Sequence, residues 1–411
     1  MQNLPFGIFS TQKLRDRRAG VAISDKVLDL KAVSKAGLFT GPILSKSAGP
    51  GGCFDQGTLN SFASLGQPAW KEARYTVQHL LSATESILRD DHQLQADCLV
   101  PQEEAIMHMP VSIGDYTDFY AAKEHASNMG ALFRGKENPL CPNWVHLPVA
   151  YHGRSSSIII SGTDVRRPRG QVHGGGEGPP TFQPCNVMDF ELEMAVIVGP
   201  GNADGTPIPV DQAEEHIFGL VLMNDWSARD IQRWEMLPLG PFNSKNFATS
   251  ISPWIVTLDA LEPFRCSAPQ QEPEVLPYLR ETNRGNYDIP LQVAIQPEGT
   301  QQPHTVTRSN LRHLYWTLPQ MLAHHTAGGC NLRPGDLIGS GTISCPAEDG
   351  KGCLAELTAG GKVPTSIGGK PYRFLQDGDA VTISGLCEKD GLKIGFGNCI
   401  GKILPARPGP V

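Results

Sequence analysis

The chain lacks any long run of basic residues. Its 35 Lys and Arg are outnumbered by 42 Asp and Glu, the formal net charge is −7, and charged residues make up only 19% of the sequence. Proteins that follow a phosphate backbone present clustered positive charge. The composition therefore argues against a nucleic-acid partner.

Paired cysteines and long apolar stretches are also lacking. The ten cysteines include no C-x-x-C pair, so neither a disulfide framework nor a zinc module is expected. The first ten residues carry no cationic flank, and the strongest apolar run, Met194 to Val198, is far too short to cross a bilayer. These features predict a reducing, cytoplasmic location and no membrane partner.

Turn-forming residues are abundant instead. The 411 residues include 44 Gly and 34 Pro, and 40% of the chain is hydrophobic, whereas average usage is about 7% Gly and about 5% Pro. Such a chain is compact and rich in short strands, and its length suits roughly two or three domains. Because the polar and apolar pattern changes near residue 117, we expect an N-terminal domain at 1–117 and a C-terminal domain at 118–411.

Local patterns place three elements. Apolar residues at helical spacing predict helices over 68–81 and over 310–326, the first opening with Pro68 in its first turn. Val381 to Cys387 and Leu392 to Cys399 flank a short link that ends in Asp-Gly, which predicts a β-hairpin.

The segment DFELEMAVIV, residues 189–198, pairs acidic residues with a buried strand. In a strand, alternate side chains share a face, so Glu191 and Glu193 project together. The apolar run that follows is typical of a strand buried on both faces. Two adjacent buried anions are costly unless something compensates their charge, and a divalent cation would do so. The alternative is a sheet edge whose glutamates are solvated.

Other acidic and polar residues extend the pattern. Asp225 follows an apolar run and precedes a predicted helix, where a helix N-cap is the ordinary role. Arg229 and Gln232 share a face of that helix. If a helix begins at Asp118, His125 lies about 10 Å further along the same face, too far to share one metal but suited to a base acting on a metal-held substrate.

Asp118, Glu191, Glu193 and Asp225 together offer only oxygen ligands. Carboxylates suit calcium or magnesium and are poor for zinc or copper, which favour imidazole or thiolate. A divalent ion would leave negative charge uncompensated, so nearby cations are expected. Arg229 and Lys245 are the candidates, although each is also compatible with a surface ion pair.

Several longer stretches, spread over nearly the whole chain, form a recognisable set: NLPFGIFST, LGQPAWKEAR, IGDYTDFY, PVAYHGR, DFELEMA, VLMNDWSARDIQRWE, NLRPGDL and SGTIS. Together they resemble the sequences of one family, the fumarylacetoacetate hydrolases. The resemblance implies a mainly β (α+β) fold, with a small N-terminal SH3-like barrel and a larger C-terminal mixed β-sandwich roll, assembled as a homodimer.

The resemblance also implies residue roles, each at the position that matches the family motif. The metal ligands would be Asp118, Glu191, Glu193 and Asp225, and a second cation position would involve Asp225, Lys245 and Thr249. Because a protonated amine cannot bind a metal, Lys245 would contribute its backbone carbonyl. The catalytic base would be His125, oriented by Glu356. Substrate contacts and oxyanion donors would be Tyr120, Arg134, Tyr151, Arg229, Gln232, Lys245 and Thr342.

The implied reaction is hydrolysis of a carbon–carbon bond in a small β-diketo acid, 4-fumarylacetoacetate, to fumarate and acetoacetate, the last step of tyrosine and phenylalanine catabolism. One departure is visible, because Met236 stands where the family has a tyrosine, and a thioether cannot replace a phenol donor. Two alternatives stay open: an acylpyruvate hydrolase or keto-acid hydratase or decarboxylase of the same superfamily, and a non-catalytic cation-binding scaffold.

Overall fold

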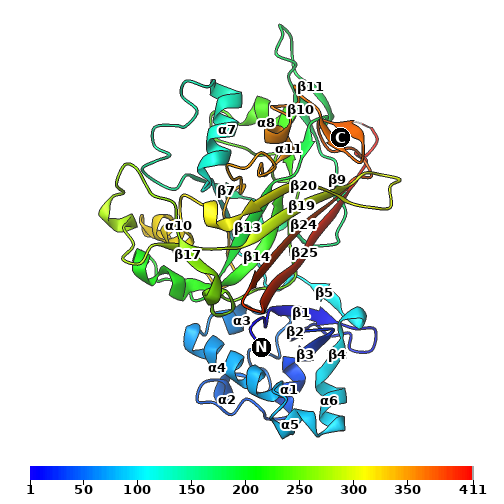
Figure 1. Cartoon of the computed structure of the whole chain (residues 1–411), viewed down its shortest axis with the longest axis vertical. Helices are drawn as coiled ribbons and strands as arrows, with labels where there is room; N and C mark the ends of the chain where they lie inside the picture. The colour runs from blue at the N-terminus through cyan, green and yellow to red at the C-terminus, as the bar shows by residue number, and fades with distance from the viewer. Residues whose placement is uncertain (410–411) are drawn as a thin grey trace.

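The computed structural model describes residues 1–409. It divides into a small N-terminal part, blue to cyan in Figure 1, and a larger part above it that holds most of the strands. The N-terminal part contains a curled antiparallel sheet in the order β4-β3-β2-β1-β5. Its strands are β1 (Phe6–Ser10), β2 (Arg18–Ile23), β3 (Lys26–Asp29), β4 (Leu99–Pro101) and β5 (Ile106–His108).

Six helices accompany this sheet. They are α1 (Leu30–Lys35), α2 (Leu44–Ser47), α3 (Asn60–Ala63), α4 (Gln67–Leu80), α5 (Ser86–Arg89) and α6 (His92–Cys98). The helix predicted over 68–81 is confirmed as α4, with Pro68 in its first turn. Proline suits that position because the first N–H groups of a helix have no intrahelical partner. Trp70, Ala73 and Val77 form its buried face.

A seven-stranded mixed sheet forms the centre of the larger part, in the order β7-β6-β21-β13-β14-β16-β8. Its strands are β6 (Tyr116–Phe119), β7 (Ala150–Gly153), β8 (Ile158–Ile160), β13 (Leu192–Val198), β14 (Ile217–Asp225), β16 (Thr249–Ile251) and β21 (Leu337–Gly339). β13 and β14 are buried at every position, as their continuous apolar runs predict for strands covered on both faces.

A second sheet of five strands has the order β20-β19-β24-β25-β9, and four of these strands run side by side in Figure 1. Its strands are β9 (Val165–Arg166), β19 (Pro290–Gln296), β20 (His304–Asn310), β24 (Ala380–Lys389) and β25 (Leu392–Leu404). The predicted hairpin is confirmed as β24 and β25, which pair antiparallel. Asp390 and Gly391 form its turn, both at positive φ, as a tight hairpin requires.

Two hydrophobic cores lie on opposite faces of the seven-stranded sheet. Met194 and Val196 of β13 join a core shared with the five-stranded sheet. Ala195 and Ile197, which point the other way, join a core built mainly from the N-terminal part. Because alternate side chains of β13 point to opposite faces of the sheet, this one strand packs against both cores. This mainly β arrangement with peripheral helices confirms the predicted fold class.

The remaining helices and strands surround these sheets. The helices are α7 (Lys123–Arg134), α8 (Arg229–Glu235), α9 (Leu258–Leu261), α10 (Leu318–Thr326) and α11 (Leu354–Leu357), and the short strands are β10 (Arg169–Val172), β11 (Thr181–Pro184), β12 (Met188–Asp189), β15 (Ser227–Ala228), β17 (Arg265–Ser267), β18 (Gly285–Tyr287), β22 (Thr365–Ile367) and β23 (Lys370–Tyr372). Within residues 1–409, no helix is both long and apolar enough to span a bilayer. All ten cysteines are free.

The helix predicted over 310–326 is wrong in its first half. Asn310 ends β20, a single 3-10 turn follows, and α10 begins only at Leu318. The physical reason is a capping box, in which the Thr317 side chain and the Gln320 side chain satisfy each other's backbone N–H groups. A capping box and a proline in the first turn mark a helix start, so Pro319 indicated the beginning of the helix and not an interruption.

Candidate active site

A cavity of about 340 Å³ opens between α7, α8 and the ends of the central strands. Its polar lining comes from Asp118, Tyr120, His125, Tyr151, Glu191, Glu193, Arg229, Gln232, Lys245 and Thr342. Apolar side chains, including Phe133, Leu239 and Pro241, line the rest. The volume lies within the usual range for a small-molecule site, about 300 to 1,000 Å³.

Three carboxylates converge beside this cavity, and two of them, Asp118 and Glu193, belong to its lining. Oxygens of Asp118, Glu193 and Asp225 all lie within 4.8 Å of one another, and each side chain is buried. The strands explain the convergence, because β14 pairs with β13, and β21 joins β13 to β6. Asp118 lies in β6, so the expectation of a helix that begins there is wrong. His125 belongs instead to α7, which begins at Lys123.

The oxygens of this cluster fit a hard cation. Within residues 1–409, Asp118 Oδ1 and both carboxylate oxygens of Glu193 have no hydrogen-bond partner although they are fully buried. Burial, together with the neighbouring carboxylates, raises the pKa of Asp118 and the pKa of Glu193 far above their ordinary values. Unpaired buried oxygens need a compensating positive charge, and an all-oxygen set matches calcium or magnesium chemistry.

Glu191 lies beside the cluster but is already engaged. Its Oε1 accepts from Arg229 Nη2 at 2.8 Å, and its Oε2 accepts from Lys245 Nζ. Burial alone would raise the pKa of Glu191, but these two cations outweigh it and hold that pKa below its usual value. Of the predicted four carboxylates, Asp118 and Glu193 therefore keep unpaired oxygens, whereas Glu191 and Asp225 are already bound by cationic or hydroxyl donors. Each Glu191 oxygen keeps a second lone pair that can still contribute.

Lys245 and Thr249 contact the cluster through side chains. Lys245 Nζ donates to Asp225 as well as to Glu191, and the Thr249 hydroxyl donates to Asp225 Oδ1 at 2.9 Å. These contacts compensate charge on Asp225. Asp225 itself is the last residue of β14, and Ala228 occupies the N-cap of α8. The N-cap alternative for Asp225 is thus wrong.

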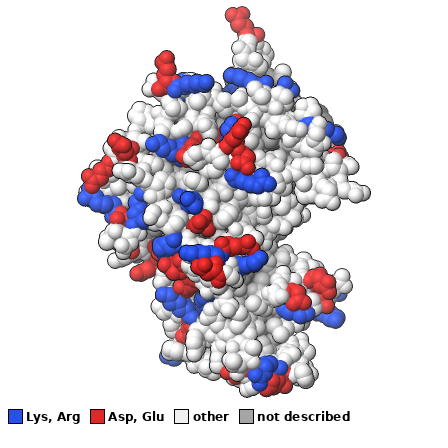
Figure 2. All heavy atoms as spheres, in the orientation of Figure 1, with Lys and Arg blue, Asp and Glu red and all other residues white. Residues whose placement is uncertain are grey.

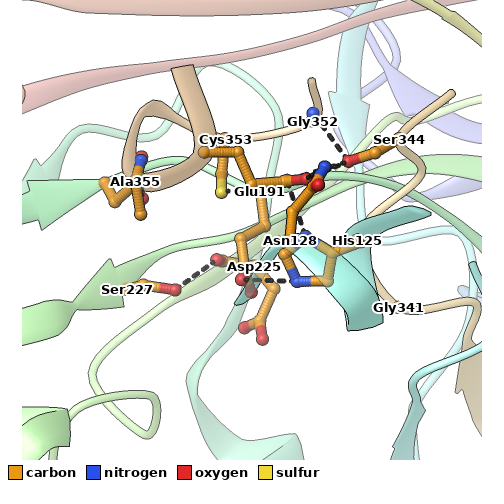
Figure 3. Close-up of polar contacts among 12 residues, drawn as sticks. His125, Asn128, Glu191, Asp225, Ser227, Gly341, Ser344, Gly352, Cys353 and Ala355 are labelled. Carbon is orange, nitrogen blue, oxygen red and sulfur yellow. Dashed lines mark hydrogen bonds and ion pairs between the residues drawn. The ribbon is translucent and has the colours of Figure 1, made fainter. Parts of the chain in front are cut away.

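His125 is held by a second buried carboxylate, that of Glu356. Its Nδ1 lies 2.6 Å from Glu356 Oε2, and its Nε2 lies 3.8 Å from Glu191 Oε1. Asn128 Nδ2 and the Ser344 hydroxyl both donate to Glu356. Burial would raise the pKa of Glu356, but His125 and these donors outweigh it and lower that pKa. Figure 3 shows Asn128 of α7 pointing toward Ser344, and a dashed line that joins His125 to Glu191.

Arg229 is fixed by three bonds at the start of α8. Its Nε donates to Asp189 Oδ2 at 2.9 Å, its Nη2 to Glu191, and its Nη1 to Gln232 Oε1 at 3.1 Å. A guanidinium has five N–H groups, so two remain for a ligand. Since the Gln232 carbonyl oxygen accepts from Arg229, its amide NH₂ group is left as a donor.

The other predicted contacts divide into two sets. Tyr120, Tyr151 and Thr342 line the cavity, and the Tyr120 ring meets His125 edge to face at 5.3 Å. The Tyr151 hydroxyl donates to Asp225 Oδ2 at 3.0 Å, so its oxygen stays free to accept. Arg134 lies outside the lining, exposed, where it donates to the backbone carbonyl of Pro139.

Met236 also lies outside the cavity lining. It is the C-cap of α8 and is half-buried.

Three functional neighbours were missed by sequence reasoning, namely Asp189, Asn128 and Ser344. For Asp189 a signal existed, because strand alternation places it in series with Glu191 and Glu193. For Asn128 the signal was its position three residues after His125 on one helix face, whereas nothing local marked Ser344.

Family models match both parts of the chain. Residues 2–110 match the family model of the fumarylacetoacetase N-terminal domain, and residues 115–403 match that of the fumarylacetoacetate (FAA) hydrolase C-terminal domain. The chain is 56% identical to a fumarylacetoacetase of Oryza sativa subsp. japonica, over 99% of this chain and 95% of that one. It is 53% identical to a Homo sapiens fumarylacetoacetase, over 99% and 96% respectively.

Solved structures share the fold at low sequence identity. A fumarylacetoacetate hydrolase from Exiguobacterium antarcticum superposes with a TM-score of 0.55 at 16% identity, covering 98% of this chain and 100% of the other. A putative HpcE protein from Mycobacterium smegmatis gives a TM-score of 0.54 at 18% identity, covering 97% and 99%. At such identities the likeness concerns the fold alone.

Proposed function

The chain belongs to the fumarylacetoacetate hydrolase family, and from this premise we propose that it hydrolyses 4-fumarylacetoacetate to fumarate and acetoacetate. The observation that carries the proposal is the meeting of two groups at one cavity. His125, which Glu356 holds, lines this cavity together with Asp118 and Glu193 of the carboxylate cluster. A cation site alone would need no buried imidazole, so a non-catalytic scaffold is disfavoured.

In the proposed mechanism His125 is the general base. Because Glu356 is ionised and accepts from Nδ1, the neutral ring carries its proton there and presents Nε2 as the acceptor. Nε2 removes a proton from water, and the resulting hydroxide attacks the diketone carbonyl carbon. Glu356 then stabilises the imidazolium, which is the proton source for the departing carbon of acetoacetate.

The oxyanion of the tetrahedral intermediate needs nearby donors. The cavity is lined by three residues with N–H groups, namely Arg229, Gln232 and Lys245. The hydrogen bonds that each side chain makes to its neighbours fix its position, so its remaining N–H groups can donate to the oxyanion. Removing one donor of this kind typically slows catalysis about 100- to 1,000-fold. The apolar lining then limits water around the developing charge, which strengthens these interactions.

We propose that the metal is calcium or magnesium. It would be held by Asp118, Glu193 and Asp225, with Glu191 adjoining, and would supply Lewis-acid polarisation of the diketone oxygens. Tyr120, Tyr151 and Thr342 would contact the substrate, and a substrate contact from Arg134 stays a prediction. The division into domains 1–117 and 118–411, the second cation position with Lys245 and Thr249, the homodimer and the cytoplasmic location stay predictions.

The test is a substrate comparison on one preparation. Fumarylacetoacetate and a set of acylpyruvates are assayed side by side, first after chelator treatment and then with calcium or magnesium restored. The proposal predicts the highest kcat/KM for fumarylacetoacetate and activity that returns only with metal. Faster hydrolysis of acylpyruvates would instead favour the related hydrolase, and the absence of turnover on every substrate would favour the scaffold.

A further inference from the structure

A buried carboxylate behind the cavity, Asp189, accepts from two separate parts of the site. It lies in the short strand β12 and is 0% exposed. Its Oδ2 accepts from Arg229 Nε at 2.9 Å and from the backbone N of Ala355 at 3.0 Å. Its Oδ1 accepts from the backbone N of Leu354 at 2.7 Å. Leu354 and Ala355 open α11.

These bonds join the two halves of the proposed chemistry. Arg229 is the residue that also binds Glu191 and Gln232, whereas α11 carries Glu356, which holds His125. We infer that Asp189 is a positioning residue that fixes the oxyanion donor Arg229 relative to the base pair of His125 and Glu356. The inference rests on the proposed function, because only in that function do Arg229 and the His125–Glu356 pair both take part in the reaction.

The chemistry of the position requires a carboxylate. All three groups that meet Asp189 are donors, and an ionised carboxylate is the side chain that only accepts. An asparagine would keep one accepting oxygen but turn its NH₂ group toward another donor. Because buried donors left without an acceptor are costly, Arg229 or the first turn of α11 would have to move in such a variant.

The chain provides a matched control at Asp29, far from the cavity. Asp29 is also 0% exposed; its Oδ2 accepts from Arg18 Nε at 2.6 Å, and its Oδ1 accepts from the backbone N of Ala32 in the first turn of α1. Both aspartates therefore bind an arginine and a helix start. Asp29→Asn and Asp189→Asn should both lose stability, but only Asp189 is joined to the site.

The experiment measures kcat and KM for fumarylacetoacetate in the wild type and both variants. Since a displacement of about 1 Å can cost about 100-fold, Asp189→Asn should lower kcat by about 10- to 100-fold with KM within a few-fold, and Asp29→Asn should keep both. Equal kcat in Asp189→Asn and Asp29→Asn would overturn the inference. An inactive wild type would contradict the proposed function instead, so the two failures are distinguishable.

Two further measurements isolate the coupling. In an Arg229→Gln background, Asp189→Asn should lower kcat much less than it does alone, because both changes disrupt the same contact. If Asp189→Asn does not fold, amide hydrogen exchange in Arg229→Gln replaces it. Exchange at Leu354 and Ala355 should then be faster than in the wild type, and unchanged exchange there would overturn the inference.

Discussion

At the scale of single residues, the site depends on the state of one imidazole. Four side chains bind Glu356, namely His125, Asn128, Ser344 and Cys353. The last three are uncharged donors and keep Glu356 ionised and fixed. An ionised Glu356 can only accept at His125 Nδ1, and this decides which nitrogen faces the cavity. The contacts that hold Glu356 therefore determine which nitrogen of His125 can act as the base.

Replacing Glu356 by glutamine tests this argument. The amide can present NH₂ to Nδ1, which would leave the proton on Nε2 and remove the base. By analogy with loss of the carboxylate in a catalytic triad, kcat should fall by about 1,000- to 10,000-fold, while metal binding stays near the wild-type value. Steady-state kinetics and a calcium titration check the two parts. A variant with kcat within a few-fold of the wild type would show that Glu356 does not set the tautomer.

At the scale of elements, three strands deliver the acidic cluster. Asp118, Glu193 and Asp225 come from β6, β13 and β14. β21 lies between β6 and β13, and its Gly339 is in register with Asp118. A Cβ atom at Gly339 would lie 2.6 Å from Asp118 Oδ1 and 2.7 Å from the methyl carbon of Met223. The glycine therefore leaves space for the Asp118 carboxylate.

Gly339→Ala should consequently push Asp118 out of the cluster while the sheet stays folded. We expect divalent-cation affinity to fall by about 10- to 100-fold, as for other changes that reorient a ligand. Gly395→Ala in β25 is the matched control, because a Cβ there meets open space. Calorimetric titration with magnesium measures both affinities. Equal affinities in the two variants would contradict this role of Gly339.

The start of α10 offers a prediction about pH. Glu281 accepts from the hydroxyl of Thr317, the N-cap of this helix. Burial raises the pKa of Glu281 from 4.5 to about 7, against smaller opposing effects of Thr317 and Arg284. The folded protein therefore holds this proton more tightly than the unfolded chain does. Its contribution to stability is largest below pH 4.5 and declines as the pH rises toward 7.

Glu281→Gln should remove that decline. Between pH 4.5 and 8, the free energy of unfolding of the wild type should fall by up to about 3 kcal/mol relative to the variant. Urea unfolding at several pH values gives both curves. Two parallel curves would show that Glu281 titrates normally in the folded protein.

The sequence predicts the parts of the fold and the site that depend on residues close together in the chain, but not those that depend on distant residues. The pairing of Glu191 with Glu193 and the helix face shared by Arg229 and Gln232 follow from local periodicity, and both pairs line the cavity. The position of Asp118 in a strand could not be predicted locally, because β6 is ordered by parallel pairing with β21, more than two hundred residues later. The same holds for Glu356, which approaches His125 only through the tertiary fold.

At the scale of the whole molecule, one strand connects the N-terminal core with the site. Phe218 of β14 lies 5.2 Å from Trp70, 5.6 Å from Phe62 and 5.8 Å from Phe6 between ring centroids. Seven residues later the same strand ends at Asp225. Charges of both signs are intermixed on the face shown in Figure 2, whereas Asp118, Glu193 and Asp225 are buried.

Phe218→Ala should therefore destabilise both parts together. Truncation of a buried phenylalanine costs about 3 to 5 kcal/mol, and the two parts share this core, so unfolding should remain a single transition at lower denaturant concentration. Phe182→Ala, at a half-exposed position of β11, should change little. Tryptophan fluorescence and circular dichroism follow the transition. Separate transitions by the two probes would show that the parts fold independently.

In the proposed site, buried carboxylates from three strands hold a hard divalent ion beside His125. Calorimetric titration of chelator-treated protein with calcium and magnesium tests it most directly, with Glu193→Gln as the variant and Glu215→Gln, on an exposed surface, as the control. We expect one tight site in the wild type and the control, and a loss of affinity of about 100-fold or more in Glu193→Gln, because both Glu193 oxygens lack any other partner among residues 1–409. Equal affinity in all three proteins would contradict it.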